Sequence, residues 1–107
     1  MEEKEKTIKI EIEALKDNPT VSVIALKGYI DSYNAQHFQN TVVNHIAEGN
    51  KNLIINAAGL SYVSSAGIGA FMAITRKLDD DSGNLVIYNM QAKVLEIFNL
   101  LGFTSFF

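Results

Sequence analysis

The feature that most constrains the fold of this chain is a strand-like run followed by a helix-like pattern, which occurs three times after residue 20. The apolar runs lie at residues 21–28, 52–59 and 85–89. Each is followed by a segment whose apolar side chains recur at helical spacing. A strand, a crossover helix and a further strand form a unit with parallel strands and a right-handed connection. The pattern therefore predicts a small α/β domain, with helices over residues 35–49 and 91–102 and, between them, a helix whose apolar stripe covers residues 68–78.

The residues before this region predict one more strand. In residues 7–15, isoleucines alternate with charged side chains, which is typical of a strand with one wet face. A turn at 16–19, which includes Pro19, leads into the next strand. The continuous apolar run 52–59 is expected to be buried on both faces.

The predicted element order is thus β-β-α-β-α-β-α, and the predicted fold class is α/β. The chain of 107 residues has the size of one domain, so residues 1–107 are expected to form it, with residues 1–6 flexible. Its sheet is expected to be mixed, mostly parallel and four- to five-stranded, with three amphipathic helices. The exposed edge strand 7–15 leaves self-association open, and we expect a monomer or a weak dimer.

Charge and composition exclude several classes of function. The net charge of −3 argues against nucleic acid as a main partner, since nucleic acid favours a basic surface. The chain has no cysteine, so a disulfide or a thiolate metal site is excluded. The N-terminal residues are charged and no apolar run approaches the length of a membrane span, so no membrane insertion and a cytoplasmic location are expected.

The sequence gives little support to a catalytic or metal site. Ser65 has glycine two positions after it, but Val63 rather than glycine two positions before it, unlike a nucleophile elbow. His37 and His45 are eight positions apart with no acidic residue between them, so they are expected to lie on the helix surface rather than to bind a metal. No phosphate-binding loop with its lysine is present. We therefore expect a protein that is not an enzyme and has no catalytic residue, metal ligand or cofactor of its own.

Two loops are expected to meet at one edge of the sheet. In parallel sheets, function gathers at the carboxyl ends of the strands, which places Asp31 near Ser64 and Ser65. Either serine could cap the following helix. The small residues after them, Ala66, Gly67 and Gly69, are expected to leave the first turn bare for a partner. A serine at such a helix N-terminus would also be a good phosphate acceptor.

These loops carry a resemblance to a family. The second strand runs into Gly28-Tyr29-Ile30-Asp31, of the form G-x-I-D. The loop Ser64-Ser65-Ala66-Gly67-Ile68-Gly69 is similar to D-S-x-G-[LI]-G, and Leu100-Leu101-Gly102-Phe103-Thr104 closes the last helix. In this order and spacing, the motifs resemble the STAS domain, and within it the stand-alone anti-sigma factor antagonists of bacteria.

The resemblance implies a STAS-like fold and a binding module regulated by phosphorylation. Ser65 matches the serine that an anti-sigma factor with serine kinase activity phosphorylates, with Ser64 as a rival acceptor. The unphosphorylated form would bind that kinase and free a sigma factor, and a serine phosphatase would reset the switch. ATP and magnesium would belong to the kinase. The expected partner-binding residues are Asp31, Ser32, Ser64, Ser65, Ala66, Gly67 and Ile68.

Two positions depart from the family pattern and keep a second interpretation open. Ser64 stands where an aspartate is usual, and Asn56 stands where an acidic residue usually ends the third strand. Both changes are expected to remove negative charge beside the acceptor, which would either ease phosphorylation or weaken recognition by the kinase. The alternative is a non-switching STAS subunit of a transporter ATPase or of a stress-signalling scaffold. The final Phe106 and Phe107 are expected either to dock on the core or to form a sticky surface.

Overall fold

The computed structural model describes residues 8–100 and shows a four-stranded sheet with three helices. The element order is β-β-α-β-α-β-α, which confirms the predicted α/β fold class. The elements are β1 (Ile8–Leu15), β2 (Asn18–Ile30), α2 (Ala35–Ala47), β3 (Asn52–Val63), α3 (Ser65–Asp80), β4 (Asn84–Tyr88) and α4 (Ala92–Leu100).

The sheet is mixed, and its strands follow one another in chain order. β1 pairs antiparallel with β2, while β2, β3 and β4 are mutually parallel. β1 and β4 therefore form the two edges of the sheet. The carboxyl ends of β2, β3 and β4 all lie along the same border of the sheet, across the strand ends, as expected for parallel neighbours joined by crossover helices.

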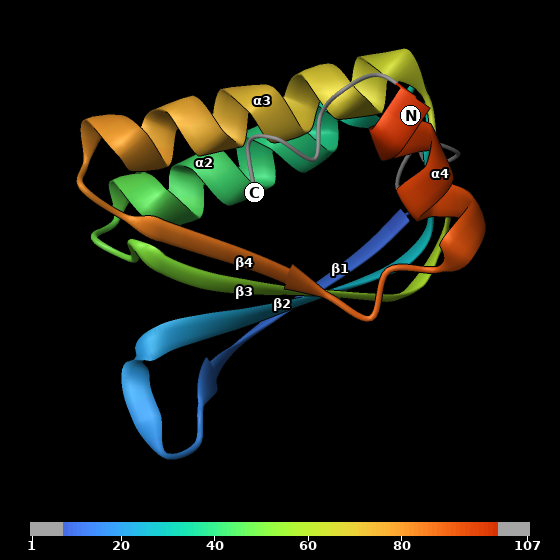
Figure 1. The fold of residues 1–107 in the computed structure, drawn as a ribbon. Helices are drawn as coiled ribbons and strands as arrows, with labels where there is room; N and C mark the ends of the chain where they lie inside the picture. The colour runs from blue at the N-terminus through green and yellow to red at the C-terminus, as the bar shows by residue number, and fades with distance from the viewer. Residues whose placement is uncertain (1–7, 101–107) are drawn as a thin grey trace.

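The core lies between one face of the sheet and the helices. Figure 1 shows α2 and α3 side by side across that face, with α4 at one end of it. Three buried phenylalanines, one from each helix, join the helical layer: Phe71 lies with its ring centre 5.0 Å from that of Phe38 and 5.4 Å from that of Phe98. Such tilted and edge-on pairs add to the burial of their apolar surface.

Helices cover only one face of the sheet, so the prediction that residues 52–59 are buried on both faces is wrong. Along β3, Leu53, Ile55 and Ala57 are buried against the helices, whereas Ile54 and Asn56 are partly exposed on the opposite face. No helix among residues 8–100 covers that face (Figure 1). An uninterrupted apolar run can therefore belong to a strand with one open face.

Two strands are longer than the sequence predicts. β2 does not end at Gly28, because this glycine adopts a φ of 110° at a shift of register and the strand continues to Ile30. β3 continues past Gly59 to Val63, where Tyr62 pairs with Tyr29 of β2. As a result, only Ser64 separates β3 from α3.

The first hairpin also differs from the expectation. Lys16 and Asp17 form the turn, and Pro19 lies within β2 rather than in the turn. The ladder skips this proline, because Leu15 pairs with Asn18 while Ala14 pairs with Ser22. The missing N–H of proline thus interrupts no hydrogen bond of the ladder. The expected end of the last helix at Gly102, the closing motif beyond Leu100, and Phe106 and Phe107 lie outside the described residues.

Candidate functional site

The loop after β2 is held in shape by its own polar side chains. The Asp31 carboxylate accepts hydrogen bonds from the backbone N–H groups of Tyr33 (2.9 Å) and Asn34 (3.1 Å). In return, the Asn34 side chain accepts from the Asp31 N–H (2.9 Å) and donates to the Tyr29 carbonyl (2.9 Å). Asn34 is fully buried, whereas Ser32 is exposed. The Asp31 carboxylate therefore has a local structural role, whatever else it contacts.

The two adjacent serines have different positions in the structure. Ser64 is the N-cap of α3, and its hydroxyl accepts a hydrogen bond from the Gly67 N–H (3.2 Å). Ser65 is the first residue of the helix, and its side chain is exposed. Among the described residues, no hydrogen-bond partner is found for the Ser65 hydroxyl. Of the alternatives that the sequence left open, the cap is Ser64, and the hydroxyl free for chemistry is that of Ser65.

A direct hydrogen bond joins the two loops. The Ser64 N–H donates to the carbonyl of Ile30, the residue before Asp31, at 2.8 Å. The expectation that Asp31 and the serines lie at one edge of the sheet is therefore confirmed. The roles predicted for these residues in partner binding and phosphorylation stay predictions.

The small residues after Ser65 divide into an inner and an outer set. Gly67 is buried, and a Cβ atom there would lie 2.7 Å from Val63 Cγ1 and 2.8 Å from Ile30 Cγ2. Ile68 is also buried, with 5% of its surface exposed. Ala66 and Gly69 are exposed, and a Cβ atom at Gly69 would meet nothing within 4 Å. Close packing inside the domain thus explains why residue 67 is glycine. Both glycines were expected to leave the helix surface bare, and only Gly69 does so.

The N-terminus of α3 can accommodate an anion. The first turn carries no acidic residue, and the Ser64 hydroxyl and carbonyl already bond the N–H groups of Gly67 and Ile68. The N–H groups of Ser65 and Ala66 have no acceptor within the helix, as is usual at this position. Together with the helix dipole, these groups favour negative charge on the Ser65 side chain.

Three exposed tyrosines next to these loops were not predicted as site residues. Tyr33 lies in the loop itself and is 73% exposed. Tyr29 and Tyr62 pair across β2 and β3, one residue before each strand ends, and both are exposed. Aromatic side chains of this kind are enriched in the energetically important centres of protein interfaces. The signal in the sequence was a tyrosine within two residues of each loop, which periodicity alone treats as a surface position.

Asn56 does not lie beside the serines. The prediction that this asparagine removes negative charge next to the phosphate acceptor is therefore wrong. It lies in the middle of β3 on the helix-free face, where its side-chain oxygen accepts from the Ala58 N–H at 3.1 Å. Ser64 lies eight positions further along the chain, which corresponds to about 25 Å along a strand. Ser64, where an aspartate is usual in the family pattern, does lie next to Ser65 in the site.

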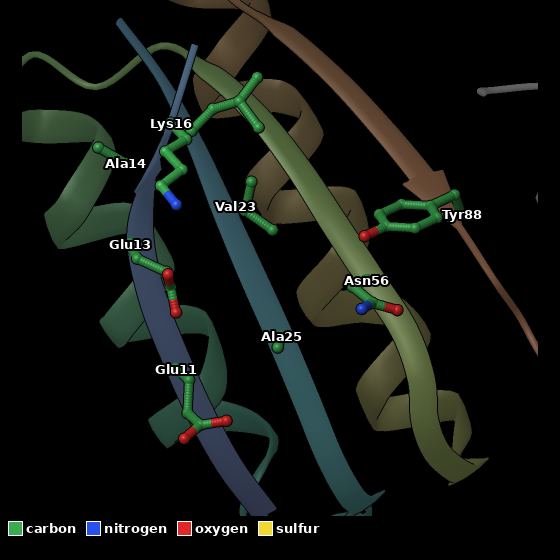
Figure 2. Close-up of a pocket in the computed structure, with 9 residues that line it drawn as sticks. Glu11, Glu13, Ala14, Lys16, Val23, Ala25, Asn56 and Tyr88 are labelled. Atoms are coloured by element: carbon green, nitrogen blue, oxygen red, sulfur yellow. The ribbon is translucent and has the colours of Figure 1, made fainter. Parts of the chain in front are cut away.

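Figure 2 shows that Asn56 belongs to a shallow concavity on this helix-free face. The hollow has a volume of about 530 Å³ and lies between the carboxylates of Glu11 and Glu13 on one side and the ring of Tyr88 on the other. Val23 and Ala25 line it from β2. Because it opens on the face opposite the helices, it is separate from the loops that carry Asp31 and Ser65.

The prediction that both histidines lie on the exposed surface is wrong. His37 and His45 are both partly buried, and His45 Nε2 forms a hydrogen bond of 2.8 Å with the hydroxyl of the buried Ser22. This contact fastens the end of α2 to β2. Within residues 8–100 no group of three or more histidine, cysteine or acidic side chains is placed to hold a metal ion. None of the helices in this part of the chain is both long and apolar enough to cross a membrane.

Comparison with known proteins assigns the chain to a family. The family model described as the STAS domain matches residues 12–107, so the chain belongs to the STAS domain family. A Bordetella bronchiseptica protein named "Putative anti-sigma factor antagonist BtrV" is 27% identical over 85 residues, which cover 79% of this chain and 73% of the relative. The anti-sigma-B factor antagonist of Bacillus subtilis is 26% identical over 88 residues, covering 82% of this chain and 80% of the relative.

Solved structures show the same fold. The anti-sigma factor antagonist SpoIIAA in its unphosphorylated form superposes with a TM-score of 0.68 at 22% identity, covering 86% of this chain and 83% of the other. The Bacillus SpoIIAA structure in the phosphorylated form gives a TM-score of 0.70 at 21% identity, covering 92% and 87%. At this level of identity, the likeness establishes the fold.

Proposed function

We propose that this STAS domain is an anti-sigma factor antagonist that phosphorylation of Ser65 switches. Unphosphorylated, it binds an anti-sigma factor through the edge formed by the two loops, and phosphorylation by that factor's serine kinase activity releases it. A serine phosphatase restores the binding form. ATP and magnesium are needed by the kinase, and the domain acts by binding rather than by catalysis.

The observation that carries the proposal is the exposed Ser65 hydroxyl at the N-terminus of α3, directly beside the Asp31 loop. A phosphate there would face two N–H groups that have no acceptor in the helix. It would also add about −1.5 to −2 charges to the surface that a partner contacts. The names of the relatives support the same reading, since both are described as anti-sigma factor antagonists.

Ser65 is a better acceptor than Ser64 for a structural reason. The Ser64 hydroxyl is half-buried and caps the helix, so a kinase would have to break the bond to Gly67 to reach it. The loss of such a cap costs about 0.5–2 kcal/mol of stability. Ser65 requires no such rearrangement.

The experiment is phosphosite mapping by mass spectrometry after incubation in an extract of the source organism with ATP and magnesium. The wild-type protein is expected to gain one phosphate on Ser65, Ser65→Ala none, and Ser64→Ala one. The Ser64→Ala variant is first checked for folding by circular dichroism, because it lacks the cap. Absence of phosphate from both serines of the wild-type protein would contradict the switch and favour the non-switching STAS subunit.

A further inference from the structure

Within residues 8–100, the edge strand β1 has no strand partner on the side away from β2, so this side can pair with another strand. β1 has β2 as its one strand partner within residues 8–100, and it lies at the end of the sheet. A strand in this position presents a row of unpaired backbone N–H and C=O groups. Its side chains alternate between the core face, with Ile8, Ile10 and Ile12, and the helix-free face, with Lys9, Glu11 and Glu13.

The charges along β1 are ordered so that the strand is complementary to a second copy of itself that runs antiparallel to it. Lys9 lies near one end of the strand and Glu13 near the other, with Glu11 between them. Figure 2 shows Glu11 and Glu13 on the same strand beside the concavity. The Lys9 ammonium lies 3.7 Å from Glu11, and among the described residues Glu13 has no ion-pair partner. A second β1 running in the opposite direction would supply one.

We infer that two copies of the domain associate by antiparallel pairing of β1 with β1, centred on Glu11, to form a continuous eight-stranded sheet. In this register, Lys9 of each copy lies opposite Glu13 of the other, which gives two cross-strand ion pairs. On the core face, Ile10 lies opposite Ile12, and Ile8 lies opposite Ala14. The core face therefore pairs apolar with apolar side chains, and the other face pairs base with acid at both ends, with one Glu11–Glu11 pair at its centre.

Other registers bring unlike or like-charged side chains together or shorten the overlap of the described strand. If one strand slid by one residue relative to the other, charged side chains would lie opposite the isoleucines of the core face. Centring on Ile12 would place Glu11 opposite Glu13, two like charges. Centring on Ile10 would also form two ion pairs, of Lys9 with Glu11, but it would leave Glu13 opposite residue 7, outside the described strand, and shorten the described overlap from residues 8–14 to residues 8–12.

The central pair of Glu11 side chains limits the strength of the dimer. Each Glu11 is held by the Lys27 ammonium of its own copy at 3.3 Å, and this hydrogen bond, with the charges of Lys27 and Lys9, keeps the pKa of the Glu11 carboxyl below its usual value. The two carboxylates thus stay ionised and repel each other, although each is partly neutralised. One pair of strands also buries less surface than a standard stable interface. The dimer is therefore weak and forms at high protein concentration.

The association is symmetric and leaves the proposed switch accessible. Pairing of an edge with itself closes at two copies, whereas pairing of β1 with β4 would continue into a filament. Because the two β1 strands run in opposite directions, the carboxyl ends of the β2 strands point away from each other. The two Ser65 loops would lie at opposite ends of the dimer, so that it could bind two partner molecules. The inference does not depend on the proposed function.

The test is sedimentation velocity of the purified protein from micromolar to millimolar concentrations. The wild type is expected to pass from monomer to dimer, and Lys9→Glu or Glu13→Lys is expected to raise the dissociation constant at least about tenfold, since each change alters two pairs per dimer. The double variant Lys9→Glu/Glu13→Lys is expected to restore dimerisation. Lys93→Glu and Glu96→Lys, exposed on α4 and carrying the same charge changes, should leave the dimer unaffected.

Glu11→Gln distinguishes the register. It is expected to lower the dissociation constant, because it removes the repulsion at the centre. In the register centred on Ile10, it would instead remove both cross-strand ion pairs with Lys9 and weaken the dimer. A protein that stays monomeric at millimolar concentration overturns the inference. So does a dimer that is insensitive to both single charge reversals, since its contact would lie elsewhere.

Discussion

At the scale of the residue, two glycines of α3 show how differently neighbouring positions are constrained. Gly67 lies against the side chains of Ile30 and Val63, both buried at the ends of their strands. Gly69 faces open space on the exposed side of the same helix. In the sequence, the two residues look equivalent.

The pair gives a prediction with opposite signs. Gly67→Ala should lower the free energy of unfolding by about 1–3 kcal/mol, because the added methyl group must displace two buried side chains. Gly69→Ala should raise it by about 0.5–1 kcal/mol, because alanine is the better helix former and meets no neighbour. Urea unfolding of both variants measures the two changes. Equal destabilisation would show that Gly69 is also packed.

At the scale of the element, the N-terminus of α2 depends on the Asp31 loop as well as on the helix itself. The N-cap residue Asn34 makes no side-chain cap bond within α2, and the Asp31 carboxylate instead accepts the N–H groups of Tyr33 and Asn34. A single substitution of Asp31 by alanine would therefore alter both the loop and any contact with a partner.

Asparagine separates these two roles. Asp31→Asn keeps an oxygen that can accept both N–H groups, so its free energy of unfolding should stay within about 0.5 kcal/mol of the wild type, whereas Asp31→Ala should lose about 0.5–2 kcal/mol. If the charge of Asp31 contacts the anti-sigma factor, both variants should bind it more weakly in isothermal titration calorimetry. Wild-type affinity of the asparagine variant would show that the carboxylate acts only within the loop.

The sequence predicted which elements form but not where two of them end. Apolar periodicity identified, in their order, the four strands and three helices that residues 8–100 form. It ended β2 at Gly28 and β3 at Gly59, because glycine is usually a break, whereas here the ladder absorbs Gly28 at a register shift and resumes with Tyr29 and Tyr62. The pairing partner decides whether a glycine ends a strand, and that partner lies more than 30 residues away in the chain.

At the scale of the whole molecule, the parts of the site that could be predicted are those that follow from topology, because the sequence pattern does not show which distant residues become neighbours. The meeting of Asp31 with Ser64 and Ser65 followed from topology, since the carboxyl ends of parallel strands share an edge. The contact of His45 with Ser22 did not follow, because a periodic pattern gives the face of a residue and not its neighbour across the fold. The distance of Asn56 from the serines did not follow, because β3 was expected to end at Gly59 and continues to Val63. Chemistry that depends on such neighbours requires the three-dimensional structure.

The whole domain is expected to tolerate phosphorylation of Ser65 without refolding, and even to gain stability. The phosphate would sit at the N-terminus of a helix of 16 residues with no acidic side chain in its first turn, and one charge in that position is worth about 0.3–1 kcal/mol. For a domain of this size, the melting temperature should rise by roughly 1–8 °C at neutral pH and low salt.

Differential scanning calorimetry of the phosphorylated and unphosphorylated protein measures this change, with Ser65→Ala treated in the same way as the control. The helix N-terminus favours the dianion, so the gain should be largest above the second pKa of the phosphate, near 6, and should decrease as the pH falls through it. It should also decrease with added salt, which screens an exposed charge. A lower melting temperature after phosphorylation would mean that the phosphate disrupts the Ser64 cap, and release of a partner would then follow from a change in the loop rather than from added charge alone.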